Sequence, residues 1–265
     1  MGKPFPFGPE YIMTHAIYPS LQGKRVIVTG GGSGIGAAIT EAFVRQGAQV
    51  SFLDIAETDS RALEQSLAEG AAHAPKFYKC DLTNLDQLKA TLAEIQNAGP
   101  VDVLVNNAAN DDRHTIEQIT PEYWDNRMAV NLRHMFFASQ AVVPGMKAQR
   151  SGAIINFGSI SWHVALPELL MYQTAKAGIE GMTRSLARDL GEHNVRVTCV
   201  VPGGVRTERQ MRLWHNPEEE ARILSQQCLK ERVDPPHVAA MVLFLASDDG
   251  RMCTSHEYFV DAGWR

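Results

Sequence analysis

The chain carries, near its amino end, the stretch Thr29-Gly30-Gly31-Gly32-Ser33-Gly34-Ile35-Gly36. A β-branched apolar run at 25–29 precedes it and predicts a strand, and the pattern at 35–45, closed by Gly47, predicts a helix. Glycines at such a turn let backbone N–H groups approach a pyrophosphate at the positive end of the helix. The stretch is compatible with a plain tight turn, but between a strand and a helix it indicates a βαβ unit that binds a dinucleotide.

The same alternation of strand and helix patterns runs through the rest of the chain. Apolar runs typical of strands covered on both faces recur at 49–54, 77–80, 101–105, 153–157, 195–200 and 258–260. Helical patterns lie between them, notably at 121–146, 169–190 and 235–245. Repeated right-handed βαβ units predict a Rossmann-type α/β fold, a doubly wound parallel sheet of about seven strands with helices on both faces. We expect an N-terminal arm over residues 1–20 and a single cofactor-binding and catalytic domain over 21–265.

Composition excludes several other classes of protein. The 265 residues are 45% hydrophobic and 21% charged, as in ordinary globular proteins, and the net charge of −5 comes without a basic stretch for nucleic acid. No apolar run approaches the ~18 residues of a membrane helix, and the amino end lacks the apolar core of a secretory signal. The four cysteines are scattered and form no metal or disulfide framework. We expect a cytoplasmic enzyme that binds neither metal, membrane nor nucleic acid.

Asp54, at the end of the second predicted strand, bears on the choice of cofactor. A carboxylate there can accept hydrogen bonds from the adenosine ribose and repels a 2′-phosphate. Neither the glycine loop nor residues 55–56 supply a Lys or Arg to hold that phosphate. The pattern favours NAD over NADP, with a plain strand-end cap as the alternative role of Asp54.

Other residues that follow predicted strands extend the same edge of the sheet. Asp81 and Leu82 come after the third strand, and Asn107 and Ala108 after the fourth. Carboxyl ends of parallel strands meet at one edge, where open sheets bind ligands. These residues are therefore predicted to contact the cofactor, with a simple turn at 106–109 as the alternative.

Tyr172 and Lys176 are spaced so that they share one face of a helix. An ammonium beside a phenol stabilises the phenolate and lowers its pKa from about 10, which would make the tyrosine a usable base. Ser159 ends the fifth predicted strand and can hydrogen-bond a reacting oxygen. Such a Tyr–Lys pair arises by chance on exposed helices, but after a strand-end serine and a nucleotide turn it indicates a catalytic site.

Together these motifs resemble the short-chain dehydrogenase/reductase family over nearly all of residues 21–265. The matching motifs are Thr29-Gly30-x-x-x-Gly34-Ile35-Gly36, Asn106-Asn107-Ala108, Ser159, Tyr172-x-x-x-Lys176 and Pro202-Gly203. The resemblance implies hydride transfer to C4 of a nicotinamide, with Tyr172 as base and Ser159 orienting the substrate oxygen. It also implies that Lys176 binds the nicotinamide ribose and that Asn131 holds a proton-relaying water. Ala109 departs from the glycine usual in the family.

The cofactor contacts predicted from the residues and from this resemblance cover the whole edge of the sheet. They are Gly30, Ser33, Gly34, Ile35, Gly36, Asp54, Asp81, Leu82, Asn107, Ala108, Tyr172, Lys176, Pro202, Gly203 and Val205. In the family, the helices that correspond to 121–146 and 169–190 pair across a two-fold axis, which implies a homodimer or homotetramer.

Two polar loops, at 110–114 and 159–163, give the clue to the substrate. Fixed donors and acceptors suit a polyhydroxylated molecule, whereas a steroid or acyl chain needs apolar walls; a solvated loop at 110–114 is the alternative. Stretches at 16–21, 174–184 and 256–265 resemble bacterial aldose 1-dehydrogenases of the family. This resemblance implies oxidation of a cyclic aldose at C1, with D-xylose giving D-xylonolactone. The substrate contacts predicted are Asn110, Ser159, Ser161, His163, Tyr172, Gly204 and Arg206.

Several alternatives to that activity stay open. L-arabinose or another aldose or polyol could be the substrate, and a 3-oxoacyl-thioester reductase or a non-catalytic NAD-sensing protein could share the fold. The family also implies a substrate lid over 204–227, with Met211 and Trp214 as apolar contacts. A surface excursion with a helix at 218–227 is the alternative there.

Overall fold

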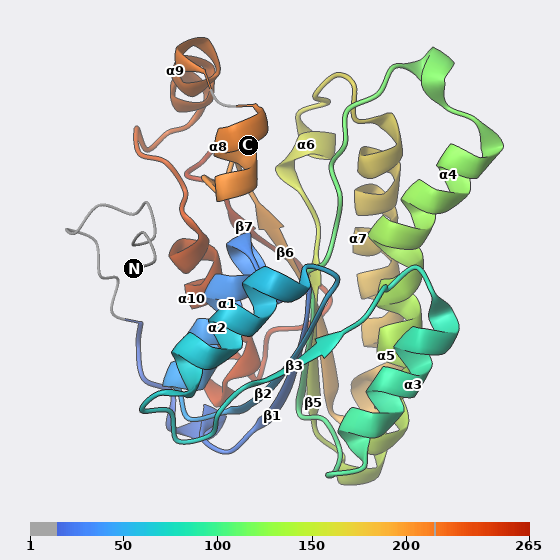
Figure 1. Cartoon of the computed structure of the whole chain (residues 1–265), viewed down its shortest axis with the longest axis vertical. Coiled ribbons are helices and arrows are strands. Elements are labelled where there is room, and N and C mark those ends of the chain that lie inside the picture. The colour runs from blue at the N-terminus through green and yellow to red at the C-terminus, as the bar shows by residue number, and fades with distance from the viewer. Residues whose placement is uncertain (1–14, 215) are drawn as a thin grey trace.

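A computed structural model describes residues 15–214 and 216–265. One sheet of seven parallel strands runs through its centre in the order β3-β2-β1-β4-β5-β6-β7 (Figure 1). The strands are β1 (Arg25–Thr29), β2 (Gln49–Asp54), β3 (Lys76–Lys79), β4 (Val103–Asn106), β5 (Gly152–Phe157), β6 (Val195–Pro202) and β7 (Glu257–Val260). The chain adds strands on one side of β1 and then on the other, which confirms the predicted doubly wound fold.

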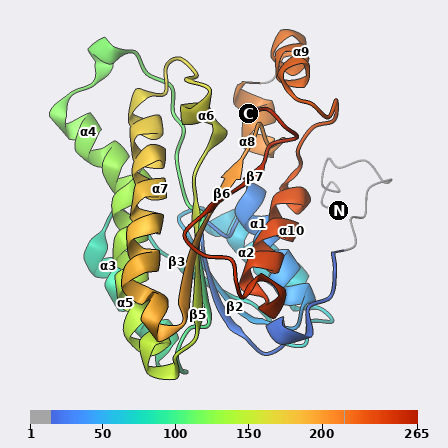
Figure 2. The ribbon, with the colours of Figure 1, turned by 180° about the vertical axis from the view of Figure 1, so that it is seen from behind.

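Helices cover both faces of the sheet (Figures 1 and 2). One face carries α1 (Gly34–Arg45), α2 (Glu57–Ala68) and α10 (Pro235–Ala246). The opposite face carries α3 (Leu85–Gln96), α5 (His134–Gln149) and α7 (Leu170–Leu190). Both faces of the central strands β4, β5 and β6 are therefore buried, as their continuous apolar runs require.

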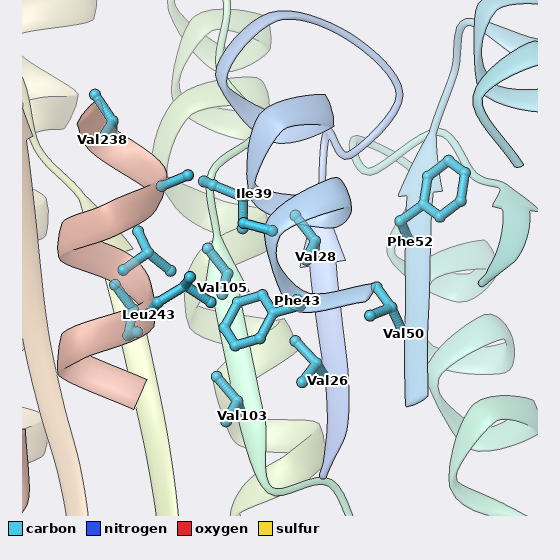
Figure 3. Close-up of a cluster of buried hydrophobic side chains, with 14 of the residues drawn as sticks. Val26, Val28, Ile39, Phe43, Val50, Phe52, Val103, Val105, Val238 and Leu243 are labelled. Carbon is cyan, nitrogen blue, oxygen red and sulfur yellow. The ribbon is translucent and has the colours of Figure 1, made fainter. Parts of the chain in front are cut away.

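The core beneath α1 and α10 illustrates how the apolar pattern holds the layers together (Figure 3). Ile39 and Phe43 of α1 point between Val28 and Val105 of the sheet and Leu243 of α10, and all five side chains are fully buried. Each such side chain contributes about 1.5–3 kcal/mol when it leaves water. This packing fixes α1, and with it the glycine turn, against β1.

The helix predicted over 121–146 is present, but its hydrogen bonding is not regular throughout. The structure has α4 (Pro121–Met128), then a π-helical turn (Ala129–Arg133), then α5. The turn buries Asn131, whose amide donates to the carbonyl of Arg127 and accepts from the backbone N–H of Asn110. Hydrogen bonding of a buried amide to a distant loop is not encoded in apolar periodicity, and so the pattern predicted one continuous helix.

Short helices stand over the carboxyl edge of the sheet (Figure 1). They are α6 (Ile160–His163), α8 (Glu208–Leu213) and α9 (Pro217–Gln226). Thr207 caps α8 and Asn216 caps α9, each accepting a backbone N–H from the first turn. The segment predicted as a lid therefore contains two helices, and the last residues of the chain lie beside α8.

The predicted N-terminal arm falls mostly on residues 1–14, which lie outside the described residues. From residue 15 onward the chain is tied to the end of α1, because Tyr18 and Ala16 both hydrogen-bond the side chain of Gln46. A 3-10 turn (Pro19–Leu21) then leads toward β1. Among the helices of the described residues, none combines the length and apolar character that spanning a membrane requires.

Candidate active site

A cleft of about 850 Å³ follows the carboxyl edge of the sheet, where open α/β sheets bind ligands. The ends of β1, β2, β4, β5 and β6 form its floor, and residues of α7, α8 and α9 form its walls. Both the glycine turn and the Tyr172–Lys176 pair open into this one cleft.

The glycine turn lies so close to the end of β4 that side chains cannot fit. A Cβ on Gly30, whose φ is 63°, would come within 2.8 Å of the Ala108 Cα, and a Cβ on Gly36 would strike the Gly30 carbonyl. The Asn107 amide donates to the carbonyls of Thr29 and Gly30, both at 3.0 Å. Bare backbone at the start of α1 is what a pyrophosphate needs, and so the turn fits a dinucleotide.

Asp54 faces the cleft and also shapes the glycine turn. One carboxylate oxygen accepts the N–H of Gly32 and the other the N–H of Ala56, both at 2.9 Å. Asp54 can therefore cap the strand end and still contact a ribose, because each of its carboxylate oxygens keeps a lone pair that can accept a further hydrogen bond. Asp59 also lines the cleft near Asp54. The lysines and arginines of the described residues that line the cleft all follow Asp112 in the sequence, so none comes from the segment that holds the glycine turn and Asp54.

Ser159, Tyr172 and Lys176 meet in the cleft. Lys176 is 1% exposed, and its ammonium donates to the Phe157 carbonyl at 2.7 Å and lies 5.3 Å from the centre of the Tyr172 ring. The hydroxyl of Ser159 lies 2.9 Å from that of Ser161 and also hydrogen-bonds the Tyr172 side chain. Ser159, between β5 and α6, thus lies in the same part of the cleft as Tyr172 and Lys176 of α7.

The pKa of Tyr172 departs from the sequence-based expectation. Burial raises it well above its ordinary value, and the Asp111 carboxylate raises it further, while the hydrogen bond from Ser159 opposes both. Burial also lowers the pKa of Lys176 to about 8. In this site by itself the pKa of the phenol is therefore raised and not lowered as expected, because burial and the Asp111 carboxylate outweigh the hydrogen bond from Ser159.

Most of the predicted contacts do line the cleft. They are Gly30, Ser33, Gly34, Ile35, Gly36, Asp54, Asp81, Leu82, Asn107, Ala108, Asn110, Ser159, Ser161, Tyr172, Lys176, Pro202, Gly203, Gly204 and Val205. Ser33, just before α1, makes no capping hydrogen bond within that helix.

Three predicted residues do not line the cleft: Asn131, His163 and Arg206. Asn131 is fully buried under the loop after β4, as described above. His163 lies behind the site, with its Nε2 3.0 Å from the carboxylate of Glu180. Arg206 turns away and forms a two-pronged ion pair with Asp234, at 2.7 and 2.8 Å.

Two contacts of the cleft wall were not specified by sequence patterns, although the first lies in the segment predicted as a lid. Arg209 and Gln210 of α8 reach the carboxylate of Asp111, and all three line the cleft. Trp264, near the end of the chain, also lines it, in van der Waals reach of Gly204. Neither contact follows a local motif, because each joins segments far apart in the sequence.

Comparison with known proteins gives the class of protein. A family model described as enoyl-(acyl carrier protein) reductase matches residues 30–265. With this match, the sheet order and the cleft, the chain belongs to the short-chain dehydrogenase/reductase family of oxidoreductases, which use nicotinamide cofactors.

Among individual proteins, the chain is 63% identical over 253 residues to a D-xylose 1-dehydrogenase of Caulobacter vibrioides, covering 96% of this chain and 100% of that protein. It is 48% identical to a probable galactose dehydrogenase of Rhizobium meliloti, over 93% and 96% of the two chains. The crystal structure of a putative short-chain alcohol dehydrogenase from Sinorhizobium meliloti superposes with a TM-score of 0.87 at 26% identity, over 93% of this chain and 98% of that one.

Proposed function

We propose that this chain catalyses the NAD-dependent oxidation of a cyclic aldose at C1, converting D-xylose to D-xylonolactone. The 63% identity to a D-xylose 1-dehydrogenase over almost the whole chain carries the proposal. The cleft supports a hydroxyl-oxidising enzyme, because Ser159, Tyr172 and Lys176 converge in it. The polar groups of Asn110, Asp111 and Ser161 in the same cleft suit a substrate with several hydroxyls.

The cofactor end of the cleft fits NAD. The turn at Gly30 and Gly36 leaves its backbone bare toward the cleft, and Asp54 with Asp59 gives the adjoining rim a negative charge. Such a rim accepts ribose hydroxyls and repels a 2′-phosphate. When bound, NAD supplies the acceptor for the hydride that leaves C1 and a positive charge that opposes the effect of burial on the pKa of Tyr172.

The chain's own residues handle the proton and the oxygen. Ser159 donates a hydrogen bond to the C1 oxygen, and Tyr172 takes the proton from the C1 hydroxyl. The O–H bonding pair becomes the second C–O bond as the hydride leaves C1, so that the product is a lactone. Lys176, held by the Phe157 carbonyl, contributes a buried positive charge that stabilises the phenolate in this step.

Steady-state kinetics over a matrix of substrates and cofactors tests the proposal. The panel contains D-xylose, L-arabinose, D-galactose, a polyol and an acetoacetyl thioester, each with the NAD and the NADP couple. We expect the highest kcat/KM for D-xylose with NAD. A preference for the thioester, or for NADP, contradicts the proposal, and a preference for another aldose replaces D-xylose by that sugar.

The proposal extends to assembly and location. We expect a cytoplasmic homodimer or homotetramer, as the family resemblance implies. Size-exclusion chromatography with light scattering measures the mass directly, and a monomer at the concentration of the assay contradicts this part.

A further inference from the structure

His114 connects the loop after β4 to the helix that carries Tyr172. Its ring is buried, with the residue only 5% exposed, and its Nε2 accepts the backbone N–H of Met171 at 3.2 Å. The first N–H groups of a helix have no partner within the helix. At α7 the N-cap residue, Leu169, makes no side-chain cap, and the imidazole of His114 fills that role from a distant loop.

The other ring nitrogen faces two oxygens. Nδ1 lies 3.1 Å from the Asp112 carbonyl and 3.0 Å from the Tyr123 hydroxyl of α4, and the Tyr123 ring meets the imidazole edge-on. Because Nε2 accepts, the neutral ring carries its proton on Nδ1 and donates it to this side. The backbone N–H of His114 also donates to the Glu168 carbonyl, just before α7.

These contacts leave His114 little freedom and place it between two parts of the site. Asp111 of the same loop lines the cleft, and Tyr172 is the residue that follows Met171. None of these hydrogen bonds joins His114 to β5 or to Ser159, which follows it. A shift of the first turn of α7 therefore moves Tyr172 relative to Ser159. Catalysis is sensitive to such shifts, since a displacement of about 1 Å can cost 10²-fold in rate.

We propose that His114 is a positioning residue, which sets the place of Tyr172 by capping α7 through Nε2. The inference rests on the proposed function insofar as its kinetic readout uses the preferred aldose. It differs from a general role in stability, because it assigns the effect to one hydrogen bond, between Nε2 and the Met171 N–H.

Two polar variants test the hydrogen bond at Nε2 separately from the contacts at Nδ1. In His114→Gln the side-chain carbonyl can occupy the Nε2 position and accept the Met171 N–H. In His114→Asn the shorter amide matches the Nδ1 position and cannot reach Met171. We expect His114→Asn to lower kcat by roughly 10- to 100-fold, with KM for NAD changed less than about twofold, and His114→Gln to recover most of kcat.

The control is His193→Leu, in the partly exposed turn that follows α7 at its other end, which should leave kcat unchanged. Amide hydrogen exchange at Met171 and Tyr172 gives a readout without substrate: it should quicken in His114→Asn and return toward the native rate in His114→Gln. If Asn and Gln lower kcat equally, or if neither changes kcat or exchange, the proposal is overturned. A native protein that oxidises no aldose contradicts the proposed function instead, and the exchange data still decide the role of His114.

Discussion

The side-chain amide of Gln210 donates a 2.6 Å hydrogen bond to the carboxylate of Asp111. It joins α8 to the loop after β4, and Arg209 beside it pairs with both Asp111 and Asp112. A carboxylate is thereby held at the cleft, where its charge adds to the effect of burial in raising the pKa of Tyr172 and opposes the effect of burial in lowering the pKa of Lys176. The position of α8 beside the cleft and the protonation of the catalytic groups are thus linked through the side chain of Asp111.

Neutralising Asp111 should shift the pH dependence of oxidation. The raised pKa of Tyr172 means that the phenol keeps its proton to higher pH, so the base form needed for oxidation appears only as the pH rises. Asp111→Asn removes one cause of that raised pKa, and the rising limb of kcat/KM should move to lower pH. Profiles of kcat/KM for the preferred aldose against pH measure the shift.

The matched control is Asp112→Asn. Asp112 pairs with Arg127 and Arg209 in the same loop but is not among the groups that shift the pKa of Tyr172. In Asp112→Asn the rising limb of kcat/KM against pH should stay at the pH of the native protein. Equal shifts in the two variants would show that the contacts between this loop and α8, and not the charge of Asp111, set the profile.

Removal of the phenol hydroxyl should stop turnover. In Tyr172→Phe the C1 hydroxyl has no proton acceptor, and we expect kcat to fall by about 10²- to 10⁴-fold, the usual contribution of general base catalysis. Binding of NAD, measured by titration calorimetry, should change little, because the glycine turn is untouched. Tyr78→Phe, on the edge strand β3, serves as the control. Appreciable turnover by Tyr172→Phe would remove Tyr172 as the base.

Asp54→Asn should weaken the preference for NAD. The neutral amide no longer repels a 2′-phosphate, and we expect the ratio of kcat/KM for NAD over NADP to fall about tenfold or more. The amide can also replace only one of the two acceptors for Gly32 and Ala56, so the KM for NAD should rise as the turn loosens. Asp59→Asn tests whether the second carboxylate shares the effect. An unchanged ratio in both variants would mean that another part of the cleft selects the cofactor.

The fold could be predicted from the sequence because its determinants are local. The Gly30–Gly36 turn must be bare and the central strands must be apolar on both faces, whatever the rest of the chain does. The Tyr172–Lys176 spacing is likewise a property of one helix. Sheet order and the convergence of both motifs in one cleft follow from these elements.

The predicted site residues that do not line the cleft are held by partners elsewhere in the chain. Arg206 had the right position after the Pro202-Gly203 turn to contact substrate, but Asp234, 28 residues later, draws its side chain away. The imidazole of His163 is likewise held by Glu180 of α7. No local pattern shows which of two neighbouring polar groups will find a partner and which will face the cleft.

Arg206→Ala therefore tests the structure against the sequence-based prediction. Since its side chain pairs with Asp234 and is 42% exposed, we expect the KM for aldose to stay within about twofold of the native value. Loss of the ion pair should lower the free energy of unfolding, measured with urea, by only about 0–1 kcal/mol. Asp234→Ala is the reciprocal control. A large rise in KM without a change in stability would restore Arg206 to the substrate site.

Trp264 offers the sharpest test of the cleft wall, because sequence patterns did not place it. Asp261 fixes the tail by accepting the N–H groups of Gly263 and Arg265, and this puts the indole beside Gly204 at the end of β6. The flat apolar face of an indole can pack on the C–H face of a sugar ring.

We expect Trp264→Ala to raise the KM for aldose about tenfold, the order for loss of one apolar contact, and to leave the KM for NAD unchanged. Trp264→Phe should recover part of the loss, and Arg265→Ala, which removes the side chain next to it without touching the cleft, should have no effect on either KM. A rise in the KM for NAD as large as that for aldose would place the indole against the cofactor instead.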